Sequence, residues 1–272
     1  SQGGSAFAML PLGENKVDVT YNDRSEVTGA TTRRGDTPVA QLAYAYDGIG
    51  NRTTARSTDE PSEVGGGQSA ETHYESNALN QYSSIRVDSS QFVVQTPSHD
   101  LDGNLIEDLK NTYTWNADNH LIRVESKDGK LRLNYTYDYQ SRRTVRVETK
   151  EPGTKNEEQK TTYYVYDAWN LVADLSDVTR HGSRVTGEQA DPVQYYTWGR
   201  DLSGSLQGAG GVGGLLAISE GATHRFPAYD ANGNVGQLLD GEGHAVAAYT
   251  YDPFGNVTEM VGAEAEGNPW RF

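Results

Sequence analysis

The sequence predicts an all-β protein in which tandem β-hairpins form an antiparallel sheet. Three observations support this prediction. A five-residue motif, Asp-x-x-Gly-Asn, recurs along the chain, runs of aromatic and β-branched residues flank its copies, and no segment shows convincing helical periodicity. Strands favour aromatic and β-branched residues, and turn signals that repeat between strands are typical of hairpin arrays.

Four copies of the motif keep all three defining residues, and a tyrosine directly precedes three of them. We expect these residues to form structural turns. They are Asp47, Gly50 and Asn51; Asp100, Gly103 and Asn104; Asp230, Gly233 and Asn234; and Asp252, Gly255 and Asn256. An aspartate that opens a type I turn can accept hydrogen bonds from backbone N–H groups two residues on. A glycine in the fourth position can take a positive φ and join two strands.

Three degenerate copies fill the middle of the chain, at residues 115–119, 137–141 and 166–170. Asn119 and Asn170 stand where the other copies have glycine, and asparagine tolerates the left-handed region better than most residues. Ser141 fits that position less well. We therefore expect hairpins here too.

Strand-like runs and polar insertions complete the pattern. Residues 249–251, 135–137 and 163–166 alternate or combine tyrosine with β-branched residues, and we expect each to lead into a turn. Polar insertions at residues 57–71, 151–160 and 181–192 are expected to be loops that lengthen the hairpins. The predicted organisation is an irregular N-terminal flank over residues 1–38 and a repeat region over residues 39–272.

Composition argues against several classes of function. The formal net charge is −15, and the 23 Lys and Arg residues are scattered, so we expect no nucleic-acid partner. No apolar run reaches the ~18–20 residues of a membrane span, so we expect no membrane insertion. The absence of Cys removes disulfides and thiolate zinc sites. The N-terminus has no signal peptide and no Met, and we expect the chain to be a piece of a larger protein.

The ordered set of Tyr-Asp-x-x-Gly-Asn units at 46–51, 229–234 and 251–256 resembles the Rhs/YD-repeat family of the bacterial polymorphic-toxin type. Residues 74–82 and 196–205 are also similar to elements of that family, and residues 249–272 resemble the start of its Rhs-associated core region. The resemblance implies a curved, spiralling sheet that forms part of a shell around a C-terminal effector or toxin segment. It also implies a secreted or cell-surface location.

From this resemblance we expect a non-catalytic structural module rather than an enzyme, with the effector segment of the parent chain as its partner. No self-cleavage residue of the family can be placed on this sequence. The alternative is an extracellular adhesion module that binds a cell-surface glycan or protein. An exposed row of aromatic residues would favour that alternative, and the candidates are Tyr137, Tyr139, Tyr164, Tyr166, Trp169, Tyr195, Tyr196 and Trp198.

Two further motifs have simpler interpretations. The acidic run at residues 100–108 is similar to a calcium loop, but its glycine stands fourth rather than sixth, so we interpret it as another hairpin turn. Residues 208–213 match Gly-x-Gly-x-x-Gly but have no long helix after them, so we interpret them as a glycine loop between strands. We expect no catalytic, metal or cofactor site, because no histidine pair has zinc-helix spacing and no nucleophile elbow occurs.

Overall fold

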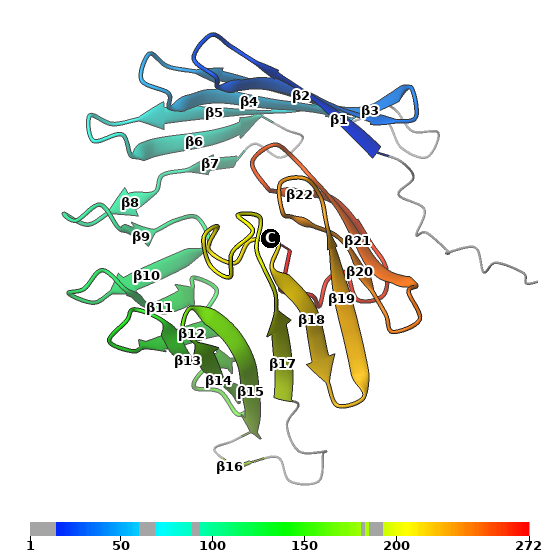
Figure 1. Cartoon of the computed structure of the whole chain (residues 1–272). Coiled ribbons are helices and arrows are strands. Elements are labelled where there is room, and N and C mark those ends of the chain that lie inside the picture. Colours follow the sequence, from blue (N-terminus) through cyan, green and yellow to red (C-terminus); the bar gives the residue numbers. More distant parts are fainter. Residues whose placement is uncertain (1–14, 60–68, 89–92, 181–182, 185–192, 272) are drawn as a thin grey trace, which may run out of the picture. The chain divides into compact units, whose positions relative to one another are not determined.

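A computed structural model describes residues 15–59, 69–88, 93–180, 183–184 and 193–271. All regular elements in these ranges are β-strands, and most consecutive strands pair antiparallel along the chain (Figure 1). The prediction of an all-β array of tandem hairpins is therefore confirmed. The strands fall into two compact units, one holding β1 to β9 and the other β10 to β22. No helix among the described residues is long and apolar enough to cross a membrane.

The first unit contains a 7-stranded sheet in simple sequence order, followed by the short hairpin of β8 and β9. Its strands are β1 (Asn15–Tyr21), β2 (Val27–Arg34), β3 (Thr37–Tyr46), β4 (Arg52–Asp59), β5 (Ser69–Ser76), β6 (Tyr82–Asp88), β7 (Val93–Gln95), β8 (Ser98–His99) and β9 (Leu105–Glu107).

The second unit also follows sequence order, except that β17 pairs with β15 while β16 lies off the path. Its strands are β10 (Asn111–Trp115), β11 (Leu121–Ser126), β12 (Leu131–Tyr137), β13 (Arg143–Lys150), β14 (Glu158–Asp167), β15 (Asn170–Arg180), β16 (Ser183–Arg184), β17 (Val193–Trp198), β18 (Leu215–Glu220), β19 (Thr223–Tyr229), β20 (Val235–Leu239), β21 (Ala245–Tyr251) and β22 (Val257–Val261).

The expected domain division and loops can be compared with these bounds. Strands β1 and β2 occupy residues 15–34, and β3 runs across residue 38, where we placed the end of an irregular flank. That division of the chain stays a prediction. Strands also extend into the polar insertions, because β4 ends at Asp59, β5 begins at Ser69 and β14 begins at Glu158. Residues 60–68, 181–182 and 185–192 lie outside the described residues.

The core of the second unit is small and mixed in character. Its buried members come from β17, β18, β20, β21 and the segment after β22, and they are Tyr196, Leu215, Ile218, Val235, Leu238, Ala247, Tyr249 and Ala265. Two of the eight are alanines and two are tyrosines. Only 35% of the chain is hydrophobic. The sheet therefore needs polar interactions to hold neighbouring hairpins in register.

Aromatic side chains supply such an interaction at the end of many strands. In each case the aromatic residue ends a strand, or stands one residue from its end, and donates to a carbonyl in the first two residues of the adjacent strand. The pairs are Tyr46 to Val27 O (2.7 Å), Tyr137 to Leu121 O (2.7 Å), Tyr166 to Arg143 O (3.0 Å), Trp198 to Leu171 O (2.7 Å), Tyr229 to Leu215 O (2.6 Å) and Tyr251 to Val235 O (2.8 Å). One hydrogen bond thus links the end of each of these strands to the start of the strand before it in the sheet.

These tyrosines should make the fold sensitive to alkali. Burial raises the pKa of Tyr229 to about 12, whereas a tyrosine in an unfolded chain titrates near ~10. A group whose pKa is raised by folding stabilises the fold below its unfolded pKa, and this stabilisation is lost as the pH rises through the folded value. We predict that resistance to urea falls between pH ~10 and ~12.

Tyr229→Phe should lower stability at neutral pH by about 1 kcal/mol, because the carbonyl of the buried Leu215 loses its donor, and should flatten the alkaline decline. Urea unfolding from pH 7 to 12 measures both effects. Tyr139→Phe is the control, since that side chain is 92% exposed. Identical profiles for Tyr229→Phe and the unmodified chain would contradict the assigned bond.

Candidate functional site: the repeat turns and the C-terminal docking segment

The four predicted turns share one hydrogen-bond network. In the Asp47 pentad, the Asp47 N–H donates to the carbonyl of Asn51 (2.9 Å) and the Gly50 N–H donates back to the carbonyl of Asp47 (3.4 Å). One carboxylate oxygen of Asp47 accepts from the N–H groups of Ile49 (3.0 Å) and Asn51 (2.9 Å), and the other accepts from the Asn51 amide (2.9 Å). The aspartate side chain therefore binds donors that the turn leaves without a strand partner.

The pentads that begin at Asp100, Asp230 and Asp252 repeat this network with side-chain distances of 2.8–3.1 Å. All four glycines have positive φ, at 96° for Gly50, 89° for Gly103, 85° for Gly233 and 82° for Gly255. The acidic run at residues 100–108 uses its first aspartate in the same way as the other pentads. Among the described residues, no cluster of three or more His, Asp or Glu side chains could hold a metal ion.

Two of the degenerate copies form the same turn, and the third does not. Asn119 and Ser141 have positive φ, at 58° and 65°. The expectation that Asn170 takes this conformation is wrong, because Asp167 and Asn170 still pair across β14 and β15. The reversal is left to the two residues between them, and Ala168 adopts the positive φ of 50°.

Three further pentads have the same network and were not predicted, at residues 22–26, 77–81 and 240–244. Their signal is a match between the first and fifth side chains. Where the first residue is Asn, its amide donates to an acceptor, as Asn22 does to Glu26 (2.6 Å) and Asn77 does to Gln81 (2.9 Å). Where the first residue is Asp, the fifth residue is a donor such as Asn, Arg or His.

The turn carboxylates are stabilised as anions. Donation from the Asn104 side chain lowers the pKa of Asp100, and donation from the His244 N–H lowers the pKa of Asp240. Because folding lowers these pKa values, the carboxylates stabilise the fold at pH values above their unfolded pKa of ~3.9. This stabilisation is lost as the pH falls through the folded pKa values.

The glycine loop between β17 and β18 binds the buried carboxylate of Asp201. One oxygen of Asp201 accepts from the Ser203 N–H and hydroxyl, and the other accepts from the N–H groups of Ala209 (2.6 Å) and Gly211 (3.2 Å). Donation from the Ser203 hydroxyl lowers the pKa of Asp201 to about 2. The Gly-x-Gly-x-x-Gly motif at 208–213 thus binds a side chain of its own chain.

Six of the eight aromatic candidates fall into three groups. Tyr137, Tyr166 and Trp198 donate to neighbouring strands, and Tyr196 belongs to the core. Tyr139 and Trp169 stand in turns and are 92% and 61% exposed.

A segment after β22, residues 263–271, docks on the core of the second unit. Its central residue is Asn268, which is 6% exposed. The Asn268 amide donates to the carbonyl of Trp270 (2.7 Å) and to the Tyr249 hydroxyl (3.3 Å), and its oxygen accepts from the Trp270 N–H (3.0 Å). The Arg271 carbonyl accepts from the Val235 N–H (2.8 Å) and the Tyr251 hydroxyl (2.8 Å). We call residues 263–271 the docking segment.

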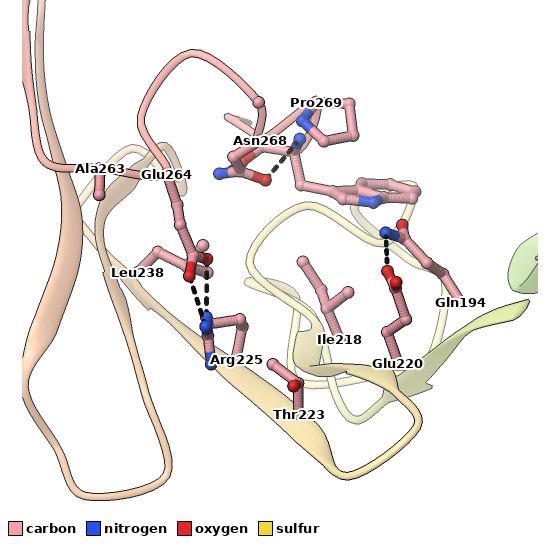
Figure 2. Close-up of a pocket in the computed structure, with 12 residues that line it drawn as sticks. Gln194, Ile218, Glu220, Thr223, Arg225, Leu238, Ala263, Glu264, Asn268 and Pro269 are labelled. Carbon is pink, nitrogen blue, oxygen red and sulfur yellow. Dashed lines mark hydrogen bonds and ion pairs between the residues drawn. The ribbon is translucent and has the colours of Figure 1, made fainter. Parts of the chain in front are cut away.

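The docking segment forms one wall of two neighbouring cavities. The first, of about 410 Å³, is shown in Figure 2. On its border Glu264 pairs with Arg225, and the Gln194 amide donates to Glu220 (2.8 Å). The second, of about 470 Å³, lies over β13, β14, β15 and β17. Trp270 lines both cavities. Sequence reasoning did not find either cavity, because both depend on strands distant in the chain.

Comparison with known proteins gives relatives of low identity. No family model matches the sequence. The chain is 28% identical over 233 residues to the tRNA3(Ser)-specific nuclease WapA of Bacillus spizizenii and, over the same length, to the tRNA nuclease WapA of Bacillus subtilis strain 168. These alignments cover 85% of this chain and 8% of each relative. The chain therefore spans a small part of the length of its curated relatives.

Two solved structures show a similar fold. A TcdB2–TccC3 crystal structure matches with a TM-score of 0.53 at 14% identity, covering 94% of this chain and 16% of that chain. A Tc holotoxin pore of Photorhabdus luminescens matches with a TM-score of 0.52 at 14% identity, covering 94% and 15%. The described strands thus share their fold with part of a toxin assembly.

These comparisons correct one expectation. The prediction that the protein is not an enzyme is contradicted by the curated relatives, which are named as tRNA nucleases. The names of the relatives and of the toxin structures also do not favour the alternative of an adhesion module.

Two glycines allow the strain of a positive φ to be separated from crowding. At Gly129, in the β11–β12 turn, φ is 75°, and no described atom lies within 4 Å of the position that a Cβ would take. At Gly233, where φ is 85°, a Cβ would lie 2.5 Å from Cγ1 of Val212. We predict that Gly129→Ala costs about 1–2 kcal/mol and that Gly233→Ala costs about 1–3 kcal/mol more. Urea unfolding measures both; equal losses would contradict the crowding at Gly233.

Asn268→Ala should detach the docking segment. The substitution leaves the backbone N–H of Trp270 without its acceptor, which should lower the free energy of unfolding in urea by about 2–3 kcal/mol. Limited proteolysis should then cut within residues 263–271 before it cuts the strands. Asn232→Ala is the control, because Asn232 is an exposed residue of a turn. Equal proteolysis of the two variants would refute the anchoring role of Asn268.

Proposed function

We propose that this chain is a wall module of an Rhs-type toxin. In this proposal its sheet encloses or presents a C-terminal effector segment, and the parent protein is secreted or held at the cell surface. The observation that carries the proposal is the docking segment, because it fixes the end of the repeat sheet on the core through Asn268 and Arg271. The alignment with WapA and the fold shared with TcdB2–TccC3 support it.

We also propose a structural role for the turn residues. The first and fifth side chains of each pentad bind the donors and acceptors of the turn, and the tyrosine before it binds the start of the preceding strand. In this way each hairpin sets the register of its neighbour. A sheet with a small apolar core can then be extended one hairpin at a time.

The relatives are named as tRNA nucleases. We propose the same activity for the whole toxin to which this chain would belong. The relatives are far longer than the aligned region, so the activity is proposed for the whole protein and tRNA for its substrate. The effector segment would be the partner of this module.

The proposal can be tested by extending the chain with an unstructured passenger peptide. One fusion carries a thrombin site directly after residue 272, and a second carries the same site after a long flexible spacer. We predict that the adjacent site is cut about tenfold more slowly, because the docking segment must open first. Asn268→Ala should remove this difference, and Asn232→Ala should keep it. Equal cleavage of the two sites in the unmodified chain would contradict a presenting role.

A further inference from the structure

The second cavity is lined by cations although the chain as a whole is acidic. Arg143, Arg146 and Lys160 face it from β13 and β14, in a protein of net charge −15. The Arg143 guanidinium lies 5.2 Å from the ring centroids of both Tyr135 and Tyr164, which hold it in place through cation–π contacts. The cationic side of the cavity is therefore positioned by the sheet itself.

These cations are incompletely matched within the protein. Among the described side chains, no carboxylate forms an ion pair with Arg143 or Lys160. Arg146 pairs with Glu148 through one terminal nitrogen, but its Nε is buried and has no hydrogen-bond partner among the described residues. A buried donor without an acceptor is unfavourable, and an acceptor supplied by a ligand would relieve it.

The rest of the cavity combines apolar and neutral polar surface. Leu171, Tyr164 and Trp270 provide apolar and aromatic walls. The hydroxyls of Thr162 and Ser176 bond each other at 3.2 Å and are buried. A ligand that fits this lining carries an acidic group beside an apolar one.

The charge of the acidic group is limited by two carboxylates, one in the cavity lining and one that pairs with a lining arginine. Asp174 lines the cavity and accepts from the Tyr196 hydroxyl at 2.6 Å, and Glu148 lies against Arg146. Burial raises the pKa of Asp174. The three cations less these two carboxylates leave one positive charge. A single carboxylate balances that charge, whereas a phosphate monoester, with nearly two negative charges, would exceed it.

We propose that this cavity binds an acidic side chain of a peptide, with the carboxylate between Arg143, Arg146 and Lys160 and a neighbouring apolar residue against Leu171 and Trp270. The inference rests on the proposed function, because a presented effector segment would supply such a peptide close to the docking segment. Its chemistry is nevertheless independent of that segment's identity.

Fluorescence anisotropy with the whole chain tests the inference. The probe is a labelled short peptide with one Glu flanked by Leu residues, and the matched probe carries Gln in place of Glu. The Glu peptide should bind about tenfold more tightly, and raising the salt concentration should reduce this preference. Equal affinities for the two peptides would overturn the proposal.

Variants locate the site. Lys160→Gln and Arg143→Gln should each weaken binding of the Glu peptide about fivefold or more. Lys155→Gln should leave it unchanged, because Lys155 is exposed in the β13–β14 turn away from the cavity lining. The cation–π contacts with Tyr135 and Tyr164 are made by Arg143. If Arg143→Gln unfolds the protein because these contacts are lost, Lys160→Gln still tests the site. The same loss from Lys155→Gln as from Lys160→Gln would refute the site.

Competition distinguishes other ligands. Propionate should displace the Glu peptide only weakly, because it lacks the apolar neighbour. Propionate that binds as tightly as the peptide would overturn the peptide as occupant, and displacement by inorganic phosphate but not by propionate would overturn the carboxylate. Passenger cleavage does not depend on these cations, so it can succeed where peptide binding fails, and the two proposals can be refuted separately.

Discussion

The fold depends on one local interaction, the capture of two backbone N–H groups by the side chain that opens each turn. A five-residue connection between strands leaves amide donors without a ladder partner, and the first Asp or Asn accepts from the third and fifth residues, as Asp138 does from Gln140 and Arg142. The fifth side chain then complements the first in most of the pentads. Within the part of the chain that the structure describes, the backbone bonds across these turns join residues of the same pentad.

The turns are joined sideways by tyrosines. Because Tyr251 donates to Val235 O, the end of β21 is linked to the start of β20. Tyr46 links β3 to β2 in the same way, and Tyr229 links β19 to β18. This explains why the motif is a tyrosine followed by an aspartate. The aspartate closes its own turn, and the tyrosine holds the neighbouring one. A sheet built in this way needs only a small core, and its surface is left free to carry charged and polar groups.

Sequence reasoning predicted the hairpins because their signal is local. Asp47, Gly50 and Asn51 belong to one pentad, and each bond within the turn can be inferred from that spacing. The pentads at Asn22 and Asn77 were missed because they replace glycine and reverse the donor and acceptor. The positive φ falls on Ala168 instead of Asn170 because Asp167 and Asn170 pair across the two strands, and the sequence does not show this additional pair. The cavity lined by Arg143 and Trp270 depends on the pairing of strands that are distant in the chain, and the spacing of residues within one motif does not predict that pairing.

Hydrogen exchange of the individual backbone amides tests the central interaction most directly. The bonding pattern separates residues within one turn: in the pentad that begins at Asp138, Gln140 and Arg142 donate to the carboxylate, and Tyr139 has no partner in the pentad. The amides of Gln140 and Arg142 should exchange much more slowly than that of Tyr139. Equal exchange at all three positions would show that the aspartate does not hold the turn.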